Sequence, residues 1–283
     1  MTKVLNLSIG GIVMELAVGP TVDHIQLQKS FIPFQTDHPA TSRFLVHYEE
    51  QSIQPTDICK LNTNAGWQIF ERGNRFVVHI DASETNSEAF MTVTQDFSTG
   101  DIFFPEGRAR LGFLPPTLAR MIIISLLSQG HGVMLHAAGV RVGNKGLLFA
   151  GTDGVGKTTT ARLWSAYGNA TIIGDDHVIV RKLQGRFWMY STPWHGIDCA
   201  TDSVSVDRVF IIRQGKKNQI EPMPPVQVAA QLLRRSFPPL WSADGITFTL
   251  EFLEQLCASV PVHDFAFVPD QSAVDIIQCM DAA

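Results

Sequence analysis

GLLFAGTDGVGKT, residues 146–158, is the stretch of sequence that decides how the rest of the chain is interpreted. Residues Gly146–Ala150 are small or apolar and predict a short buried strand. The segment Lys157–Tyr167 has helical character, with apolar residues at positions 161, 163, 164 and 166. The glycine-rich segment between strand and helix has the spacing Gly-x-x-x-x-Gly-Lys-Thr, which is typical of loops that wrap a polyphosphate.

Each part of this loop has a physical reason. Glycines let the backbone curl so that successive N–H groups face a phosphate, and the following helix adds the partial positive charge of its N-terminus. Lys157 is expected to reach the β- and γ-phosphates, and the Thr158 hydroxyl to bind Mg²⁺. An accidental glycine-rich turn is the alternative, and the strand and helix on either side argue against it. We therefore expect ATP and Mg²⁺ as cofactors, bound by Gly151, Asp153, Gly154, Val155, Gly156, Lys157, Thr158 and Thr159.

Two adjacent carboxylates, Asp175 and Asp176, close the next apolar segment, Thr171–Ile173. Acids at the carboxyl end of a strand lie where α/β folds place their active-site groups. One carboxylate can hold the metal, directly or through water, and the other can accept a proton from an attacking hydroxyl. The alternative interpretation is a solvated Gly-Asp-Asp turn.

Other candidate residues carry a weaker signal on their own. His136 lies between two short apolar segments, where a histidine is more often structural. The segment Thr192–Gly196, TPWHG, contains a proline and a glycine that suggest a rigid turn, from which Trp194 and His195 could line a substrate pocket. Four basic side chains could contact phosphate: Lys216, Lys217, Arg234 and Arg235. Each of them alone is more typical of a solvated surface charge.

Taken together, Leu135-His136, the loop at 151–158 and Gly174-Asp175-Asp176 resemble the HPr kinase/phosphorylase family. That family shares its core with the ATP-dependent phosphoenolpyruvate carboxykinases. Its members have a histidine fifteen residues before the first loop glycine, as His136 stands before Gly151 here. The resemblance implies an α/β fold: a P-loop-containing core with a mixed sheet, preceded by a β-rich N-terminal region.

The resemblance also implies roles for the site residues. Asp175 would accept the proton of the target serine, Asp176 would lie with Thr158 at the metal, and His136 would tune the two acids. The expected catalytic residues are therefore His136, Lys157 and Asp175. LHAAGV before the loop, and GDD followed by TPWHG after it, look closer still to HPr-kinase-like proteins of bacterial peptide-modification gene clusters. Some of those proteins resemble kinases of precursor-peptide serines.

The sequence thus predicts an ATP- and Mg²⁺-dependent kinase that acts on a Ser or Thr hydroxyl of a peptide or small protein. Trp194 and His195 are the expected substrate contacts. Two alternatives stay open: a kinase of a small hydroxyl metabolite, and a nucleotide-binding regulatory subunit of a biosynthetic cluster with little turnover. Analogy with the family also suggests a homo-oligomer.

The first 115 residues are predicted to be β-rich, with no catalytic motif. Pro115-Pro116 precede a predicted helix at Thr117–Ser128, and a turn is predicted at Ser98–Gly100. We expect a β-rich region of unknown function at 1–115 and a P-loop kinase-like domain at 116–283. The predicted strands of the first region are Lys3–Leu7, Ile12–Val18, Phe44–Tyr48, Trp67–Phe70, Arg75–Ile80 and Met91–Thr94.

Several elements are also predicted around and beyond the loop. Two apolar segments, Val133–Leu135 and Ala138–Val142, flank His136. After the acid pair, turn signals predict that Val178–Leu183 pairs with Arg186–Tyr190, and that Arg208–Arg213 pairs with Gln219–Glu221. The remaining predictions are helices at Pro225–Ser236, Leu250–Ala258 and Ser272–Met280, and a strand at Val262–Val268.

Composition narrows the class of protein. Of 283 residues, 45% are apolar and 17% charged, which indicates a globular chain. The net charge of -5 argues against a nucleic-acid partner, since such proteins usually carry a basic excess. The longest apolar run, Met121–Leu127, is far too short for a membrane span, so no membrane partner is expected. Four cysteines without paired spacing predict buried thiols in a reducing compartment, and we expect a cytoplasmic protein.

Overall fold

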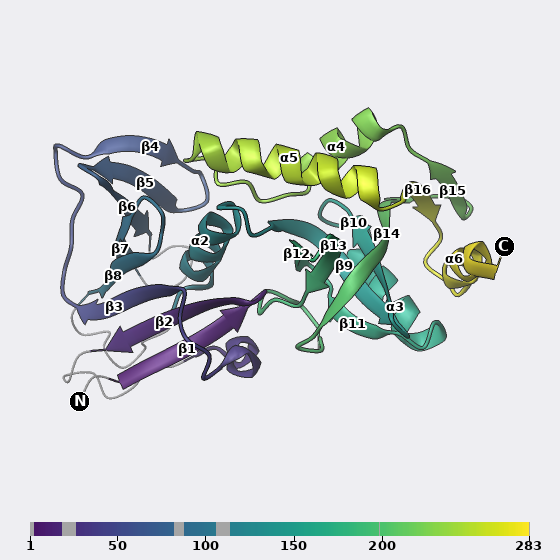
Figure 1. Cartoon of the computed structure of the whole chain (residues 1–283), viewed down its shortest axis with the longest axis horizontal. Helices are drawn as coiled ribbons and strands as arrows, with labels where there is room; N and C mark the ends of the chain where they lie inside the picture. Colours follow the sequence, from purple (N-terminus) through teal and green to yellow (C-terminus); the bar gives the residue numbers. More distant parts are fainter. Residues whose placement is uncertain (1–2, 19–26, 82–87, 106–113, 198, 283) are drawn as a thin grey trace. The chain divides into compact units, whose positions relative to one another are not determined.

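The computed structural model describes residues 3–18, 27–81, 88–105, 114–197 and 199–282 (Figure 1). The chain forms two compact units. The first comprises Met1–Gln129 with Pro239–Ala243, and the second comprises Gly130–Pro238 with Asp244–Ala283. Each unit holds a large sheet with both parallel and antiparallel neighbours. The predicted α/β class, with a mixed sheet and a β-rich N-terminal region, is therefore confirmed.

The sheet of the first unit has the strand order β1-β2-β3-β8-β7-β6-β5-β4. In β3, Ser42, Phe44 and Val46 are buried while Arg43 and Leu45 are exposed, which is the period-two pattern of a strand covered on one face. The strands are β1 (Lys3–Ile9), β2 (Ile12–Val18), β3 (Ser42–Tyr48), β4 (Ile58–Asn62), β5 (Trp67–Arg72), β6 (Arg75–Ile80), β7 (Ala89–Thr94) and β8 (Thr99–Phe104).

Helix α2 (Pro116–Leu127) packs on β2 and fills much of the core of this unit. Pro116 takes the first helical position, where a missing N–H costs nothing. The predicted helix at Thr117–Ser128 is confirmed to within one residue. It belongs to the first unit, whereas the predicted boundary at residue 115 assigns it to the second domain. A short 3₁₀ helix, η1 (Lys29–Phe34), buries two further phenylalanines.

The turn between β7 and β8 lies earlier than the sequence predicts. The Asp96 carboxylate accepts a hydrogen bond from the Ser98 N–H at 3.1 Å, so the chain turns at residues 95–98. Gly100 is inside β8, where a Cβ would lie only 2.7 Å from the carbonyl oxygen of Thr92. This glycine serves the close approach of two strands rather than a turn. Strands β4 and β8 are absent from the sequence-based prediction.

The segment Pro239–Ala243 returns the chain to the first unit. Trp241 meets Trp67 edge-on with ring centroids 6.1 Å apart, and its ring lies 6.3 Å from that of Phe97. Aromatic pairs of this kind contribute about 0.5–1.5 kcal/mol beyond the burial of their area. The first unit is thus completed by residues that come more than a hundred positions later in the sequence.

In the second unit, β9, β12, β13, β14 and β10 form a closed circuit of strand pairings. Strand β14 is parallel to both β10 and β16. The strands are β9 (Val133–Val142), β10 (Lys145–Ala150), β11 (Thr171–Gly174), β12 (His177–Leu183), β13 (Arg186–Tyr190), β14 (Ser203–Gln214), β15 (Gln219–Pro222) and β16 (Val262–Phe267). The helices are α3 (Lys157–Tyr167), α4 (Pro225–Leu233), α5 (Ala243–Ser259) and α6 (Ser272–Ala282).

Two cores lie on opposite faces of this sheet. Leu147 and Phe149 of β10 join a core with residues of α3 and α6, such as Trp164 and Ile277. Their neighbours Leu148 and Ala150 join the other core, with residues of α4 and α5. Strand β10 is therefore buried on both faces, which explains why its sequence is a continuous apolar run rather than an alternating one.

One strand and one pairing differ from the sequence-based prediction. His136 does not separate two segments, because Val133–Val142 is one continuous strand. The predicted pairing of Arg208–Arg213 with Gln219–Glu221 is wrong: β16 lies between β14 and β15 and pairs with both. Strand β16, whose second half Phe265–Phe267 is apolar and buried, takes the inner place. Strand β15 is mostly polar and ends in proline, which suits the edge of a sheet.

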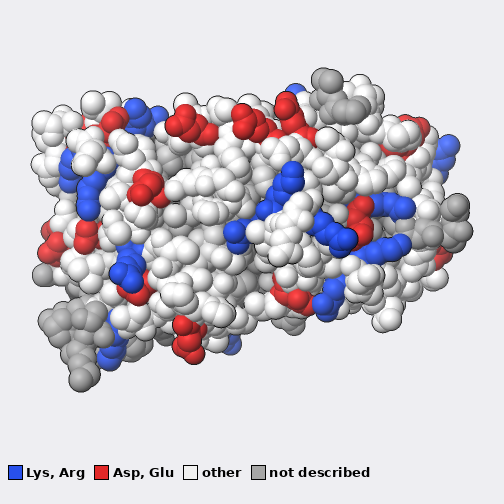
Figure 2. All heavy atoms as spheres, in the orientation of Figure 1, with Lys and Arg blue, Asp and Glu red and all other residues white. Residues whose placement is uncertain are grey.

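The predictions made from composition, on membrane spans and on buried cysteines, agree only in part with the structure. No helix within the described ranges is long and apolar enough to cross a membrane. On the face that Figure 2 shows, basic and acidic side chains are interspersed. The prediction of buried cysteines is wrong for Cys59 and Cys279, which are exposed, because Cys59 lies on the edge strand β4 and Cys279 lies in the last helix, α6.

Replacing Gly146 by alanine is expected to destabilise the protein by about 1–3 kcal/mol, the usual cost of overpacking. A Cβ at this position would overlap the carbonyl oxygen of Ser205 on the neighbouring strand β14. Urea unfolding followed by circular dichroism measures the change. Gly196→Ala is the control, because the nearest atom to its Cβ would lie 3.4 Å away. Equal stabilities of the two variants would contradict the close approach of β10 and β14.

Candidate functional site

The glycine-rich loop connects β10 to α3 in the second unit, as the sequence predicts. Gly154 and Gly156 have φ angles of 72° and 115°, which side chains with a Cβ rarely adopt. A Cβ at Gly156 would also lie 2.6 Å from the ring of Phe267. The loop begins with a hydrogen bond of 3.2 Å from the Gly151 N–H to the carbonyl of His136. Its curvature therefore depends on glycine, and its start is fixed to β9.

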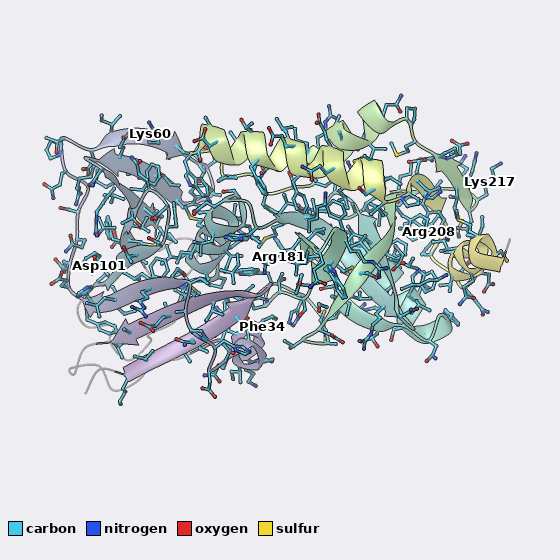
Figure 3. The ribbon with its side chains drawn as sticks, in the orientation of Figure 1. Phe34, Lys60, Asp101, Arg181, Arg208 and Lys217 are labelled. Carbon is cyan, nitrogen blue, oxygen red and sulfur yellow. The ribbon has the colours of Figure 1, made fainter. Side chains whose placement is uncertain are left out.

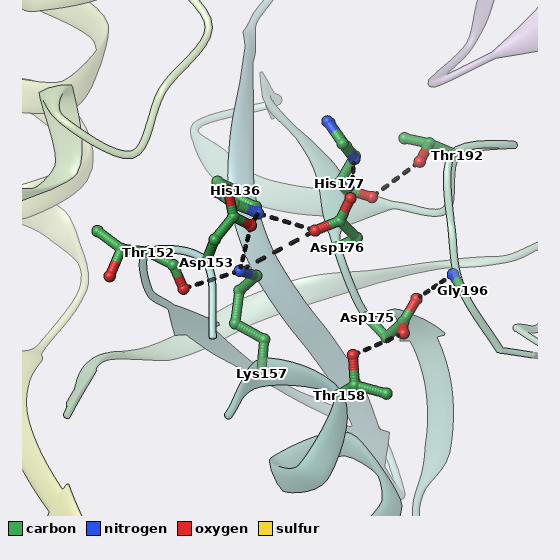
Figure 4. Close-up of polar contacts among 10 residues, drawn as sticks. All are labelled: His136, Thr152, Asp153, Lys157, Thr158, Asp175, Asp176, His177, Thr192 and Gly196. Carbon is green, nitrogen blue, oxygen red and sulfur yellow. Dashed lines mark hydrogen bonds and ion pairs between the residues drawn. The ribbon is translucent and has the colours of Figure 1, made fainter. Parts of the chain in front are cut away.

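Lys157 begins helix α3, and its side chain is only 6% exposed. Its Nζ donates a hydrogen bond to the Thr152 carbonyl at 3.0 Å and lies 3.8 Å from Asp153 Oδ1 and 4.0 Å from Asp176 Oδ1 (Figure 4). Burial lowers the pKa of Lys157, and the nearby carboxylates of Asp176, Asp153 and Asp175 offset this only in part. The result is a poorly hydrated cation at the N-terminus of a helix.

Asp175 follows β11 and is 1% exposed. Its Oδ2 accepts a hydrogen bond from the Thr158 hydroxyl at 2.9 Å, and its Oδ1 accepts one from the Gly196 N–H, also at 2.9 Å (Figure 4). Both oxygens of the carboxylate are thus engaged. Asp175 joins the start of helix α3 to the turn at residues 192–196.

Asp176 has a different set of partners. Its Oδ1 lies 2.8 Å from His136 Nε2, and its Oδ2 lies 2.7 Å from His177 Nδ1. Burial raises the pKa of Asp176, but the hydrogen bonds and charges of His136 and His177 outweigh burial and hold this pKa below its usual range. The carboxylate therefore remains ionised near neutral pH.

His136 and His177 face each other on neighbouring strands. They are directly opposite in the register of β9 and β12, and their rings are 5.8 Å apart. The ring of Phe237 stacks on His177 at 4.8 Å and lies 6.0 Å from His136. The sequence analysis identifies His136 but misses His177 and Phe237. The position of His177 directly after the acid pair is a signal that could have found it.

Asp153, at the apex of the loop, joins the same group of side chains. It is 94% exposed, and its Oδ1 lies 3.1 Å from His136 Nε2. The ligand atoms of His136, Asp153 and Asp176 all lie within 4.8 Å of one another, a spacing that could hold a metal ion. Thr159 is exposed, whereas the hydroxyl of Thr160 donates to the carbonyl of Gly156 at 2.9 Å and stabilises the first turn of α3.

The turn at residues 192–196 lies beside the acid pair, and it is attached there at both ends. The Thr192 hydroxyl donates to the His177 carbonyl at 2.8 Å, and the Gly196 N–H donates to Asp175. Trp194 is only 8% exposed, and its ring lies 6.4 Å from that of His177. His195 is half-buried. The indole thus supports the turn from inside, and His195 is the more accessible of the two predicted substrate contacts.

Among the four predicted phosphate-binding cations, Arg235 has a backbone contact with a site residue. Its carbonyl accepts a hydrogen bond from the His136 N–H at 2.6 Å, and its Nη1 donates to the carbonyl of Gln231 at 2.8 Å. Burial lowers the pKa of Arg235, and its charge in turn lowers the pKa of Lys157. Arg234 is exposed, as are Lys216 and Lys217 in the connection from β14 to β15, where Figure 3 labels Lys217.

Comparison with known proteins does not assign this chain to a family. No protein-family model and no curated protein sequence matches this chain. Among solved structures, the chain is similar to the Hpr(Ser) kinase/phosphatase from Coxiella burnetii, with 11% sequence identity over 53% of this chain and 99% of that chain. The TM-score is 0.31, too low to assign this chain to that family. The family resemblance of the loop and acid pair therefore stays a prediction.

Trp194→Ala is expected to destabilise the protein by about 3–5 kcal/mol, as truncation of a buried aromatic side chain usually does. The sequence alone suggests instead that Trp194 contacts the substrate, in which case truncation would leave stability unchanged. Chemical denaturation distinguishes the two roles. His195→Ala is the matched control, because this neighbouring side chain is half-buried and its loss is expected to cost far less. A stable Trp194→Ala protein would contradict a supporting role for the indole.

Proposed function

We propose that this protein is a kinase that transfers the γ-phosphoryl group of ATP to a hydroxyl group. One observation carries the proposal: Lys157 and Thr158 begin a helix after a glycine-rich loop, and the Thr158 hydroxyl is bonded to the first of two adjacent carboxylates. A cation, a hydroxyl and two acids at a helix N-terminus are the parts that phosphoryl transfer needs, since its catalysis is mainly positioning and neutralisation of charge.

The loop and the nearby cations would bind the nucleotide. Backbone N–H groups of the loop and the N-terminus of α3 would contact the phosphates, and Lys157 would bridge the β- and γ-phosphates. In the described structure the Lys157 amine is held by the Thr152 carbonyl, which a phosphate oxygen would replace. Arg235 would supply a second positive charge; its Nε is buried without a hydrogen-bond partner among the described residues. A phosphate contact with these cations is strong because they are poorly hydrated.

The residues around Thr158 suit a magnesium ion. The Thr158 hydroxyl and the Asp175 carboxylate lie 2.9 Å apart, and oxygen ligands of these two kinds are what Mg²⁺ prefers. We infer that these two residues would hold Mg²⁺, which would supply positive charge to the phosphates. The family resemblance assigns the metal side to Asp176 instead. The hydrogen bond from Thr158 to Asp175 favours the opposite assignment of the two acids.

Asp176 is then the carboxylate left for the acceptor. It lies beside Lys157, and His136 and His177 fix its two oxygens. We propose that Asp176 aligns the acceptor hydroxyl with the γ-phosphate, with His136 as its positioning partner. Because its pKa is low, Asp176 would accept the proton late, when the hydroxyl has already begun to bond to phosphorus.

The proposed acceptor is a serine or threonine of a peptide or small protein. The half-buried His195 and the exposed Gly196 lie in a turn that is hydrogen-bonded to Asp175. An acceptor that approaches the two acids along this turn would therefore meet the exposed backbone of Gly196. An extended chain can bond to such backbone groups as well as to side chains. A small hydroxyl metabolite would make fewer contacts there, and it is the competing acceptor in the test that follows.

Incubation with radiolabelled [γ-³²P]ATP, Mg²⁺ and peptides encoded by neighbouring genes is expected to label a Ser or Thr hydroxyl, which mass spectrometry locates. Lys157→Ala should abolish labelling and weaken ATP binding by about 10- to 100-fold, the scale of a hydrogen bond to a charged group. Calorimetric titration with MgATP measures the affinity. Labelling of small hydroxyl compounds in place of peptides would replace the peptide acceptor, and wild-type ATP affinity in the variant would contradict the nucleotide site.

Asparagine substitutions separate the roles of the two acids. Asp175→Asn is expected to raise the Mg²⁺ concentration needed for half-maximal activity, because a metal ligand loses its charge. Asp176→Asn should keep that Mg²⁺ requirement and reduce the transfer rate by roughly a hundredfold or more, as loss of a proton acceptor does. Magnesium titrations of the phosphotransfer rate for both variants provide the measurement. The reverse pattern would restore Asp175 as the proton acceptor and Asp176 as the metal ligand.

A further inference from the structure

The turn at residues 192–196 is connected to the nucleotide loop through one carboxylate. We propose that Asp175 couples the occupancy of the nucleotide site to the position of this turn, so that nucleotide binding prepares the acceptor side of the site. This inference rests on the proposed function, because it assumes that the loop binds a nucleotide. Asp175 and the backbone N–H of Gly196 would then position the turn. The glycine-rich loop motif alone does not predict this role.

The contacts form an unbroken series. Thr158 is next to Lys157 in α3, its hydroxyl donates to Asp175 Oδ2, and Asp175 Oδ1 accepts from the Gly196 N–H. Each bond is 2.9 Å long, and the two use opposite oxygens of one carboxylate. A rotation of this carboxylate that improves one bond must therefore change the other.

Burial makes this series effective. Asp175 is 1% exposed, so water has little access to its oxygens and cannot easily replace either donor. Mg²⁺ brought by a nucleotide would be held by the Thr158 hydroxyl and Asp175 together, as proposed above, and its charge would attract the Asp175 carboxylate. The carboxylate is then drawn towards Thr158, and the Gly196 N–H follows it.

The two ends of the turn differ in freedom. Thr192 is 1% exposed, and its hydroxyl is fixed to the His177 carbonyl at 2.8 Å. Gly196 is exposed, and its N–H bond to Asp175 holds this end. Movement of Asp175 would therefore shift the Gly196 end while the Thr192 end stays in place. Trp194 lies between the two ends against His177, where its fluorescence can report the change.

Two substitutions at one position isolate the bond. Gly196→Ala keeps the N–H, and its Cβ would have only Asp175 Oδ2 nearby, at 3.4 Å. Gly196→Pro removes the N–H. The probe is a non-hydrolysable ATP analogue with Mg²⁺, with affinity measured by calorimetry and the turn followed by tryptophan emission. The chain has five tryptophans, so a Trp194→Phe protein identifies the share of the signal that comes from the turn.

Wild type and Gly196→Ala are expected to change emission with the same dissociation constant that calorimetry gives. Gly196→Pro should bind the analogue within about tenfold of wild type, because the N–H that is lost donates to the Asp175 carboxylate and not to the nucleotide, but it should show no change in Trp194 emission. In the kinase assay, the KM for the peptide should be about tenfold higher in Gly196→Pro than in Gly196→Ala, which keeps the N–H. This difference distinguishes the hydrogen bond from a general need for glycine.

The outcomes separate this inference from the proposed function. Failure of wild type to bind the analogue overturns the nucleotide site itself. Binding in wild type without a change in Trp194 emission, or an equal change in Gly196→Pro, overturns the coupling and leaves the kinase proposal intact. If circular dichroism shows that Gly196→Pro is unfolded, Asp175→Asn replaces it, because one of its two side-chain atoms can no longer accept a hydrogen bond. It is used at a Mg²⁺ concentration at which calorimetry still shows binding of the analogue, so that a weaker metal site is not mistaken for loss of the coupling. A wild-type emission change in Asp175→Asn then contradicts the coupling.

Discussion

The arrangement of the site depends on the burial of β10 on both faces. Alternate residues of this strand enter two separate cores, which hold α3 and α6 on one side and α4 and α5 on the other. The strand cannot shift by one residue without exchanging Phe149 with a neighbour that fits the opposite core. This constraint fixes where β10 ends, and hence where the glycine-rich loop and the N-terminus of α3 begin. The positions of the loop and of the first residues of α3 therefore depend on packing in the two cores rather than on contacts with a substrate.

Several ionisable side chains lie together beside the glycine-rich loop. Lys157, His136 and His177 surround Asp176, while Asp175 is satisfied by a hydroxyl and a backbone amide. Such a group is costly to bury unless every member has a partner, and here each of these two acids has at least two. The two adjacent carboxylates thus differ in their surroundings: Asp176 lies beside the Lys157 amine and two imidazoles, whereas Asp175 is held by a hydroxyl and a backbone amide. That difference lets neighbouring residues of the same type serve different purposes.

Local sequence signals predicted the loop, the acid pair and most strands, because glycine spacing and apolar runs act over a few residues. They failed where distant segments compete. The hairpin predicted between β14 and β15 is wrong because β16, forty residues further on, takes the inner position. His177 and Phe237 were missed because their role comes from the register of β9 with β12 and from the return of the chain after α4. The sequence suggests that Trp194 contacts the substrate, because a local turn signal does not show that tertiary packing leaves this side chain only 8% exposed.

The return of the chain at Pro239–Ala243 also limits how the two units could be exchanged between genes during evolution. The first unit is not encoded by one continuous stretch, because it comprises Met1–Gln129 and Pro239–Ala243. The ring of Trp241 in the second segment packs near those of Trp67 and Phe97 in the first. A gene fragment that stops at codon 129 would leave those two rings uncovered. Exchange of the N-terminal unit between related genes would therefore separate Trp241 from its partners, so the two units are expected to be inherited together rather than shuffled as independent modules.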